Sequence, residues 1–200
     1  MTTPPTNAGL KFPTEVLNAE EAKALLHTPS GRAPTGIRNR ALIATMYGAG
    51  LRLSEVLALR PVDIDLDAGS IRILHGKGDK ARTVGIDDGA LMHLARWIDA
   101  RKARGIKGRV LMCTLDGGPL SPRYVRAMMT RSADKAGIDK RVHPHGMRHT
   151  HAAELECGGF TVSEIQQQLG HSSLATTATY LAHISPSQRV AKVKMRRATL

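Results

Sequence analysis

The stretch HPHGMRHTHAAEL, residues 143–155, places four histidines and one arginine within nine positions. His145 and His149 are four residues apart, which is a spacing that two zinc ligands use on one helical face. The residue after His145 is, however, Gly146 where a zinc hydrolase would have glutamate, and Arg148 would set a permanent positive charge beside the ion. No second cluster of cysteine or carboxylate ligands follows. The pattern therefore favours a bound anion over a metal.

Arg148 and His145 together suit one bound phosphate. Arginine presents a planar fork that matches two phosphate oxygens, and it stays charged at any working pH. His145 lies three residues earlier, on the same face of the expected helix, where it can donate to that phosphate or exchange a proton with it. His143 precedes a proline and is expected outside the helix, whereas His149 and His151 are expected to pack or cap.

Further polar residues lie at the ends of expected elements. Arg52 separates two helices, and Glu55 three residues later can hold it or a nearby base. Lys77 lies between two glycines in a tight turn, so its backbone can approach a phosphodiester and its ammonium can donate a proton. His171 follows a glycine at a helix end, and Tyr180 lies nine residues later. Because the ordinary pKa of tyrosine is about 10, a nucleophilic tyrosine needs a base or a strong positive field.

Each of these residues also has a plainer interpretation. Arg52 and Glu55 alone would be unremarkable on a helix surface, and a lysine-bearing glycine turn is common in solvated hairpins. Arg82, in the same hairpin, fits such a solvated position. The other two tyrosines are weaker candidates, because Tyr47 is expected in the core, and Tyr124 in the core or against a DNA backbone.

The charge of the chain points to a polyanion. There are 29 Lys and Arg against 17 Asp and Glu, a formal charge of +12, and such an excess most often serves nucleic acid. Aromatic residues are only 3% of the chain, which disfavours stacking on single strands and favours double-stranded DNA. No apolar run approaches the roughly 20 residues that span a bilayer. Without a signal-peptide pattern or a disulfide framework, we expect a cytoplasmic protein with no membrane partner.

Hydrophobic periodicity predicts a mainly helical α+β fold. Three short strands alternate and are rich in β-branched residues, which indicates a small three-stranded antiparallel sheet. They are expected at residues 62–66, 70–74 and 81–86, joined by turns at 67–69 and 76–79. Helices are expected at about residues 18–28, 37–48, 54–59, 88–105, 122–137, 145–157 and 163–170, followed by one that holds Tyr180 and one from Ser185. Their starts are marked by caps at Asn18, Ser121 and Thr161.

Taken together, these residues resemble the catalytic domain of the tyrosine recombinases, the phage-integrase and Xer-type group. The matching blocks are YGAGLRLSEVLALRPVDID, GKGDKAR, HPHGMRHTHAAEL and LGHSSLATTATYLAH, in the family's order. The resemblance covers about residues 15–184. It implies a site-specific recombinase or integrase that cleaves and rejoins DNA through a 3′-phosphotyrosyl intermediate, without metal or other cofactor.

The resemblance also implies a role for each residue of the site. Arg52 and Arg148 match the two arginines that clamp the non-bridging oxygens of the scissile phosphate. His145 matches the residue that accepts the tyrosine's proton, and His171 the position that supports the phosphate. Glu55 matches an acidic position that contacts these residues and not the phosphate.

Strand cleavage itself falls to two further residues. Tyr180 matches the nucleophile, and Lys77 matches the general acid for the leaving 5′-hydroxyl. Storing the bond energy in a phosphotyrosine conserves it for religation, so no ATP is required. The family recombines as a homo-tetramer on two DNA duplexes. The basic segment 185–200 is therefore expected to be a C-terminal helix or tail that docks on a neighbouring copy or faces DNA.

Two departures from the family pattern stand out. Met147 replaces a common leucine, which conserves volume. The helical core-binding domain that usually comes first has no counterpart in residues 1–14, which we interpret as a tail or as the linker of an excised domain; a naturally short recombinase is the alternative. Other functions left open are a type IB topoisomerase, a non-catalytic DNA-binding module and a metal-dependent nuclease.

Overall fold

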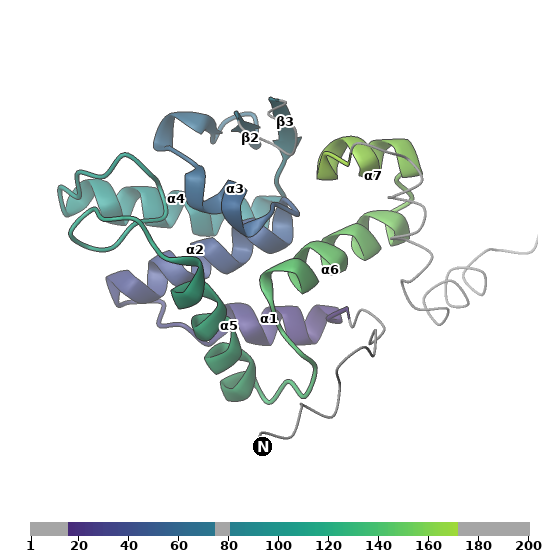
Figure 1. Ribbon diagram of the computed structural model, residues 1–200, viewed down its shortest axis with the longest axis horizontal. Coiled ribbons are helices and arrows are strands. Elements are labelled where there is room, and N and C mark those ends of the chain that lie inside the picture. Colours follow the sequence, from purple (N-terminus) through teal and green to yellow (C-terminus); the bar gives the residue numbers. More distant parts are fainter. Residues whose placement is uncertain (1–15, 75–80, 172–200) are drawn as a thin grey trace, which may run out of the picture.

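The computed structural model describes residues 16–74 and 81–171 of the chain, which form a helical body with one small sheet (Figure 1). The sheet contains β1 (Ile64–Asp65), β2 (Ser70–Ile73) and β3 (Arg82–Gly85), and a 3-10 turn, η1 (Pro61–Asp63), precedes it. The helices are α1 (Ala19–His27), α2 (Pro34–Gly48), α3 (Leu53–Ala58), α4 (Asp88–Ala103), α5 (Pro122–Ala136), α6 (Pro144–Cys157) and α7 (Val162–Leu169). The predicted mainly helical α+β class is therefore confirmed.

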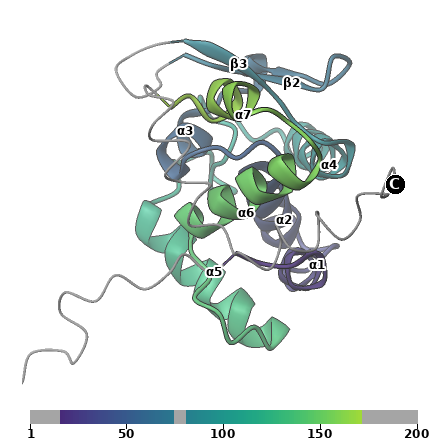
Figure 2. The ribbon, with the colours of Figure 1, turned by 90° about the vertical axis from the view of Figure 1, so that its right-hand side faces the viewer.

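Helix α2 lies at the centre of the fold, where it packs along α4 and also contacts α6. Helices α1 and α5 pack together at one end, and the sheet lies at the opposite end with α7 against β3 (Figures 1 and 2). The apolar core includes the fully buried Trp97, whose indole Nε1 donates to the carbonyl of Leu111 at 2.9 Å. Helix α6 contacts both α2 and α7 and runs between them (Figure 1).

The helix starts follow from the caps that the sequence displays. Asn18 forms a capping box at α1, Ser121 caps α5, and Thr161 forms a capping box at α7, all as predicted. Helix α6 begins differently, because His143 is its N-cap: the imidazole Nδ1 accepts the backbone N–H of Gly146 at 3.1 Å. His143 therefore lies just outside the helix, as expected, but serves as its cap.

The sheet is antiparallel with the order β1-β2-β3, and its first strand is shorter than predicted. Pro61 cannot donate to a strand ladder, and the Asp63 carboxylate accepts the backbone N–H of Arg60 at 2.9 Å, so residues 61–63 turn instead. Strands β2 and β3 pair as expected, with Ile71 opposite Val84. The predicted turn at 76–79, and both helices predicted after His171, lie outside the described residues.

The chain turns tightly between α2 and α3 at Gly50, which has φ +62°. A Cβ added there would lie 2.4 Å from Cδ2 of His151 on α6. The His151 ring therefore packs directly on this backbone, and the side chain is buried. Burial, followed by the charge of Arg148, lowers the pKa of His151 to about 4, against opposing effects of a hydrogen bond to the Tyr47 backbone and of Asp87.

The packing at Gly50 predicts that Gly50→Ala destabilises the fold more than a backbone effect alone. Gly105 has φ +61° with nothing within 4 Å of an added Cβ, so Gly105→Ala isolates the cost of the left-handed backbone. We expect the free energy of unfolding to fall by about 1 kcal/mol in Gly105→Ala. In Gly50→Ala we expect it to fall by roughly 2 kcal/mol more, because the added methyl group also clashes with His151. Urea unfolding of both variants measures the difference, and equal losses would contradict the contact with His151.

The buried imidazole predicts acid sensitivity. The folded-state pKa of His151, about 4, lies below the unfolded value of about 6.5, so the unfolded state binds more protons between these values. Above pH 6.5 the His151 ring is neutral in both states and costs the fold nothing. As the pH falls from 6.5 toward 4, the free energy of unfolding decreases, because only the unfolded state takes up the proton. From pH 7.5 to 5 the wild type should lose about 2 kcal/mol more than His151→Gln. Urea unfolding at both pH values measures this, and parallel losses would show that His151 is not buried as a neutral ring.

Candidate functional site

The first turns of α6 carry His145 and Arg148 on one face. The cap at His143 and Pro144 in the first turn fix where this helix begins, so the two side chains lie one turn apart. Arg148 is only 1% exposed, an unusual burial for a permanent charge that must be satisfied by hydrogen bonds.

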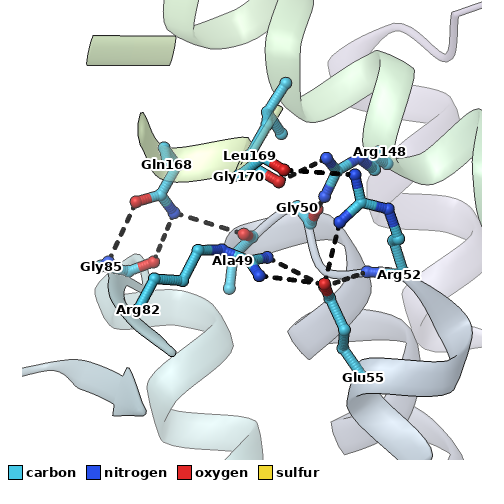
Figure 3. A network of polar contacts seen from close by, with 10 residues as sticks. All are labelled: Ala49, Gly50, Arg52, Glu55, Arg82, Gly85, Arg148, Gln168, Leu169 and Gly170. Atoms are coloured by element: carbon cyan, nitrogen blue, oxygen red, sulfur yellow. Dashed lines mark hydrogen bonds and ion pairs between the residues drawn. The ribbon is translucent and has the colours of Figure 1, made fainter. Parts of the chain in front are cut away.

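Two backbone carbonyls, from segments distant in the sequence, accept hydrogen bonds from the Arg148 guanidinium. Its Nη1 donates to the carbonyl of Gly50 at 2.7 Å, and its Nη2 donates to the carbonyl of Leu169 (Figure 3). Gly50 lies in the turn before α3, and Leu169 ends α7. One side chain therefore joins α6 to both neighbouring segments of the site.

Arg52 approaches the same place from the start of α3. Its Nη1 donates to Oε1 of Glu55 at 2.9 Å, its backbone N–H donates to Oε2 at 2.9 Å, and its Nη2 points to the carbonyl of Gly170 at 3.4 Å (Figure 3). The Arg52 side chain stays 27% exposed, whereas that of Glu55 is only 3% exposed. The buried Glu55 therefore binds Arg52 from the interior side, in agreement with their spacing of three residues in the sequence.

Arg52, His145 and Arg148 line one cleft of about 470 Å³. None of the described residues around this cleft is a carboxylate, and the cationic and titratable ones are Arg52, Arg126, Arg141, His143, His145 and Arg148. The cleft is therefore suited to an anion, and the structure brings His145 and Arg148 together in its lining.

The imidazoles near the cleft are held neutral. Burial lowers the pKa of His145, and the charges of Arg148, His143 and Arg52 lower it further. The rings of His145 and His149 meet edge to face at 4.4 Å, and burial with the surrounding positive charges lowers the pKa of His149 to about 3. A neutral His145 beside two guanidiniums can accept a proton from an incoming acid.

His171 lies at the edge of this group. Gly170 ends α7 in the left-handed conformation, and the His171 N–H then donates to the carbonyl of Gln166 at 3.2 Å. The electrostatic interaction of His171 with His149 is the smallest of the effects that lower the pKa of His149. His171 is thus brought toward the histidines of α6, whereas Lys77 and Tyr180 lie outside the described residues.

The other two tyrosines are engaged elsewhere. The Tyr47 hydroxyl donates to the carboxylate of Glu154, and burial followed by this carboxylate raises the pKa of Tyr47. Tyr124 is hydrogen-bonded to Arg38 and Asn39, with 2.6 Å between the Arg38 guanidinium and the hydroxyl. Neither tyrosine lines the cleft.

Interpreting Arg82 as a solvated hairpin residue was wrong. Its Nη1 and Nη2 donate to Oε1 and Oε2 of Glu55 at 3.0 and 2.9 Å, and its side chain is 14% exposed (Figure 3). The signal available in the sequence was alternation, because Arg82 shares its face of β3 with the buried Val84. Gln168 was also missed: it bridges the backbone of Gly85 and the carbonyl of Ala49.

The described residues, 16–74 and 81–171, contain neither a metal-binding cluster nor a membrane-spanning helix. No group of three or more histidine, cysteine, aspartate or glutamate side chains in these ranges is placed to hold a metal ion. None of the helices in these ranges is long and apolar enough to cross a bilayer.

Comparison with known proteins identifies relatives of this chain. A model of the phage integrase family matches residues 15–186. Tyrosine recombinase XerD of Staphylococcus aureus is 35% identical over 177 residues, which cover 87% of this chain and 59% of the relative. Tyrosine recombinase XerC of Xanthomonas campestris is 39% identical over 179 residues, which cover 90% and 54%. The chain thus spans somewhat more than half the length of these relatives.

Solved structures agree with the sequence relatives. The crystal structure of XerA recombinase superposes with a TM-score of 0.84 at 29% identity and covers 98% of this chain and 70% of that one. XerH site-specific recombinase bound to palindromic difH substrate gives a TM-score of 0.74 at 30% identity and covers 97% and 56%. With the family model matching most of its length, the chain belongs to the phage integrase family.

Proposed function

We propose that this chain is the catalytic domain of a site-specific DNA recombinase or integrase, which cleaves and rejoins DNA through a 3′-phosphotyrosyl intermediate. The observation that carries the proposal is the cleft without described carboxylates that is lined by Arg52, His145 and Arg148. Such a cleft fits a phosphodiester, because phosphoryl transfer is accelerated mainly by positioning and by stabilising charge on the phosphate oxygens.

Strand cleavage then proceeds by transesterification. The neutral His145 accepts the proton of Tyr180, whose oxygen forms a bond to phosphorus while the bond to the 5′-oxygen breaks. Lys77 donates a proton to that leaving oxygen. Arg52 and Arg148 hold the non-bridging oxygens, with support from His171, and attack by another 5′-hydroxyl reverses the steps. Two guanidiniums and an ammonium supply the positive field, and the two imidazoles exchange a proton or hydrogen-bond to the phosphate, so neither a metal nor ATP is needed.

The whole protein's setting follows from its charge and its relatives. The proposed partner is double-stranded DNA, consistent with the charge of +12 and with the structure of XerH bound to its difH substrate. Recombination would require a homo-tetramer on two duplexes in the cytoplasm. We propose that residues 15–184 form the catalytic domain, after a tail or linker at residues 1–14 and before a basic C-terminal helix or tail at 185–200.

The nucleophile predicts a covalent adduct that Tyr180→Phe abolishes. The protein is mixed with a pool of nicked duplexes in EDTA and resolved on a denaturing gel, where a slower band marks the adduct. Tyr180→Phe should give no band yet still shift duplex on a native gel, whereas Tyr124→Phe should keep the band. An adduct formed by Tyr180→Phe would contradict the assignment of Tyr180 as the nucleophile. Wild-type protein that binds duplex without forming an adduct would indicate a binding module.

The buried guanidinium predicts that Arg148→Lys cannot substitute. An ammonium cannot reach two phosphate oxygens in a planar fork and cannot join the carbonyls of Gly50 and Leu169. We expect adduct formation to slow by on the order of 100-fold or more, measured as the rate per folded molecule with circular dichroism as the folding control. A near-normal rate would remove Arg148 from contact with the phosphate.

A further inference from the structure

Arg82 is an inward-facing arginine outside the set of residues assigned to the reaction. It begins β3 and makes two parallel contacts to the Glu55 carboxylate, Nη1 to Oε1 at 3.0 Å and Nη2 to Oε2 at 2.9 Å. The side chains of Arg82 and Glu55 are 14% and 3% exposed. A bidentate pair of this kind, shielded from water, is stronger and more directional than a surface ion pair.

The same guanidinium touches the turn that carries His171. A Cβ added at Gly170 would lie 2.6 Å from Nε and 2.8 Å from Cζ of Arg82, so the arginine packs on bare glycine backbone. Gly170 directly precedes His171, and its carbonyl faces Nη2 of Arg52 at 3.4 Å. Arg82 therefore meets both Glu55 and the end of α7 (Figure 3).

Glu55 is shared between two arginines. Its Oε1 accepts from Arg52 at 2.9 Å and from Arg82 at 3.0 Å. Burial acts to raise the pKa of Glu55, but the hydrogen bonds and charges of Arg82 and Arg52 lower it overall, so the carboxylate is ionised. One negative charge is thus divided between two positive ones, and the group keeps a net positive charge.

We propose that Arg82 is a positioning residue that keeps Arg52 available for the DNA phosphate by sharing the carboxylate of Glu55. Without Arg82, the buried carboxylate has Arg52 as its remaining guanidinium partner, and Arg52 is drawn into an internal ion pair. A buried charge that loses one partner binds the other more strongly, because few alternatives to that partner exist out of water. The inference rests on the proposed function for its meaning, but its test has a readout that does not need cleavage.

The test compares Arg82→Met with the double variant Arg82→Met/Glu55→Gln in the full chain. If Arg82 serves only to hold the fold together, removing Glu55 as well cannot help. If Arg82 protects Arg52, neutralising Glu55 releases Arg52 and restores part of its function. Arg101→Met is the matched control, because Arg101 is also a buried arginine, 7% exposed, whose guanidinium donates to the carbonyl of Gly108.

Two quantities are measured for each variant. The first is the rate of adduct formation on nicked duplex, normalised to the folded fraction. The second is the slope of log K against log salt for duplex binding in the Tyr180→Phe background, since each phosphate neutralised contributes about −0.9 on B-DNA. We expect Arg82→Met to slow adduct formation at least tenfold and to make the slope shallower by about one phosphate. The double variant should recover at least threefold in rate and most of the slope, with Arg101→Met near wild type in both.

The outcomes separate the two proposals. Wild-type rates and slopes in Arg82→Met, or a double variant no better than the single one, would overturn the role of Arg82. Wild-type protein without an adduct would overturn the proposed function, while the salt slopes would still decide the inference about Arg82. If Arg82→Met does not fold by circular dichroism, Arg82→Gln takes its place, because its amide can still donate to the Glu55 carboxylate while the positive charge is lost.

Discussion

The burial of the Arg148 guanidinium is the constraint on which the rest of the site depends. A permanent charge that is 1% exposed must find strong acceptors inside the protein, and it finds them in the carbonyls of Gly50 and Leu169. The turn before α3 and the end of α7 are thereby held against α6. Arg52 follows the first of these segments and His171 the second, so the hydrogen bonds of one arginine help to fix where both residues lie.

The charges of the cleft are arranged in two layers. The described lining is cationic or neutral, and its imidazoles stay neutral because burial and nearby guanidiniums disfavour their protonation. Behind it lies one buried carboxylate, Glu55, held by both Arg52 and Arg82. This order suits an enzyme that binds a dianionic transition state, since the carboxylate orients a guanidinium without facing the phosphate.

Local rules predicted most of the helices, and the expectations drawn from them failed at the first strand and at Arg82. The caps at Asn18, Ser121 and Thr161 satisfy N–H groups within three residues, so their partners are visible in the sequence. The first strand came out shorter because Arg60 and Asp63 formed a turn that competed with pairing. The inward direction of Arg82 was misjudged, although its alternation with Val84 had been available.

The sequence by itself determined the chemistry of this protein: which side chains carry positive charge, which histidines share a helix face, and where the capped helices begin. These features depend on residue type and on spacings of three or four positions, which helix geometry converts directly into contacts. Only the tertiary structure decided that Arg148 would reach carbonyls 98 and 21 residues away, and that Arg82 would reach a carboxylate 27 residues earlier. Such contacts follow from the packing of whole elements, because the cost of burying a charge is settled by whatever acceptors the fold brings to it.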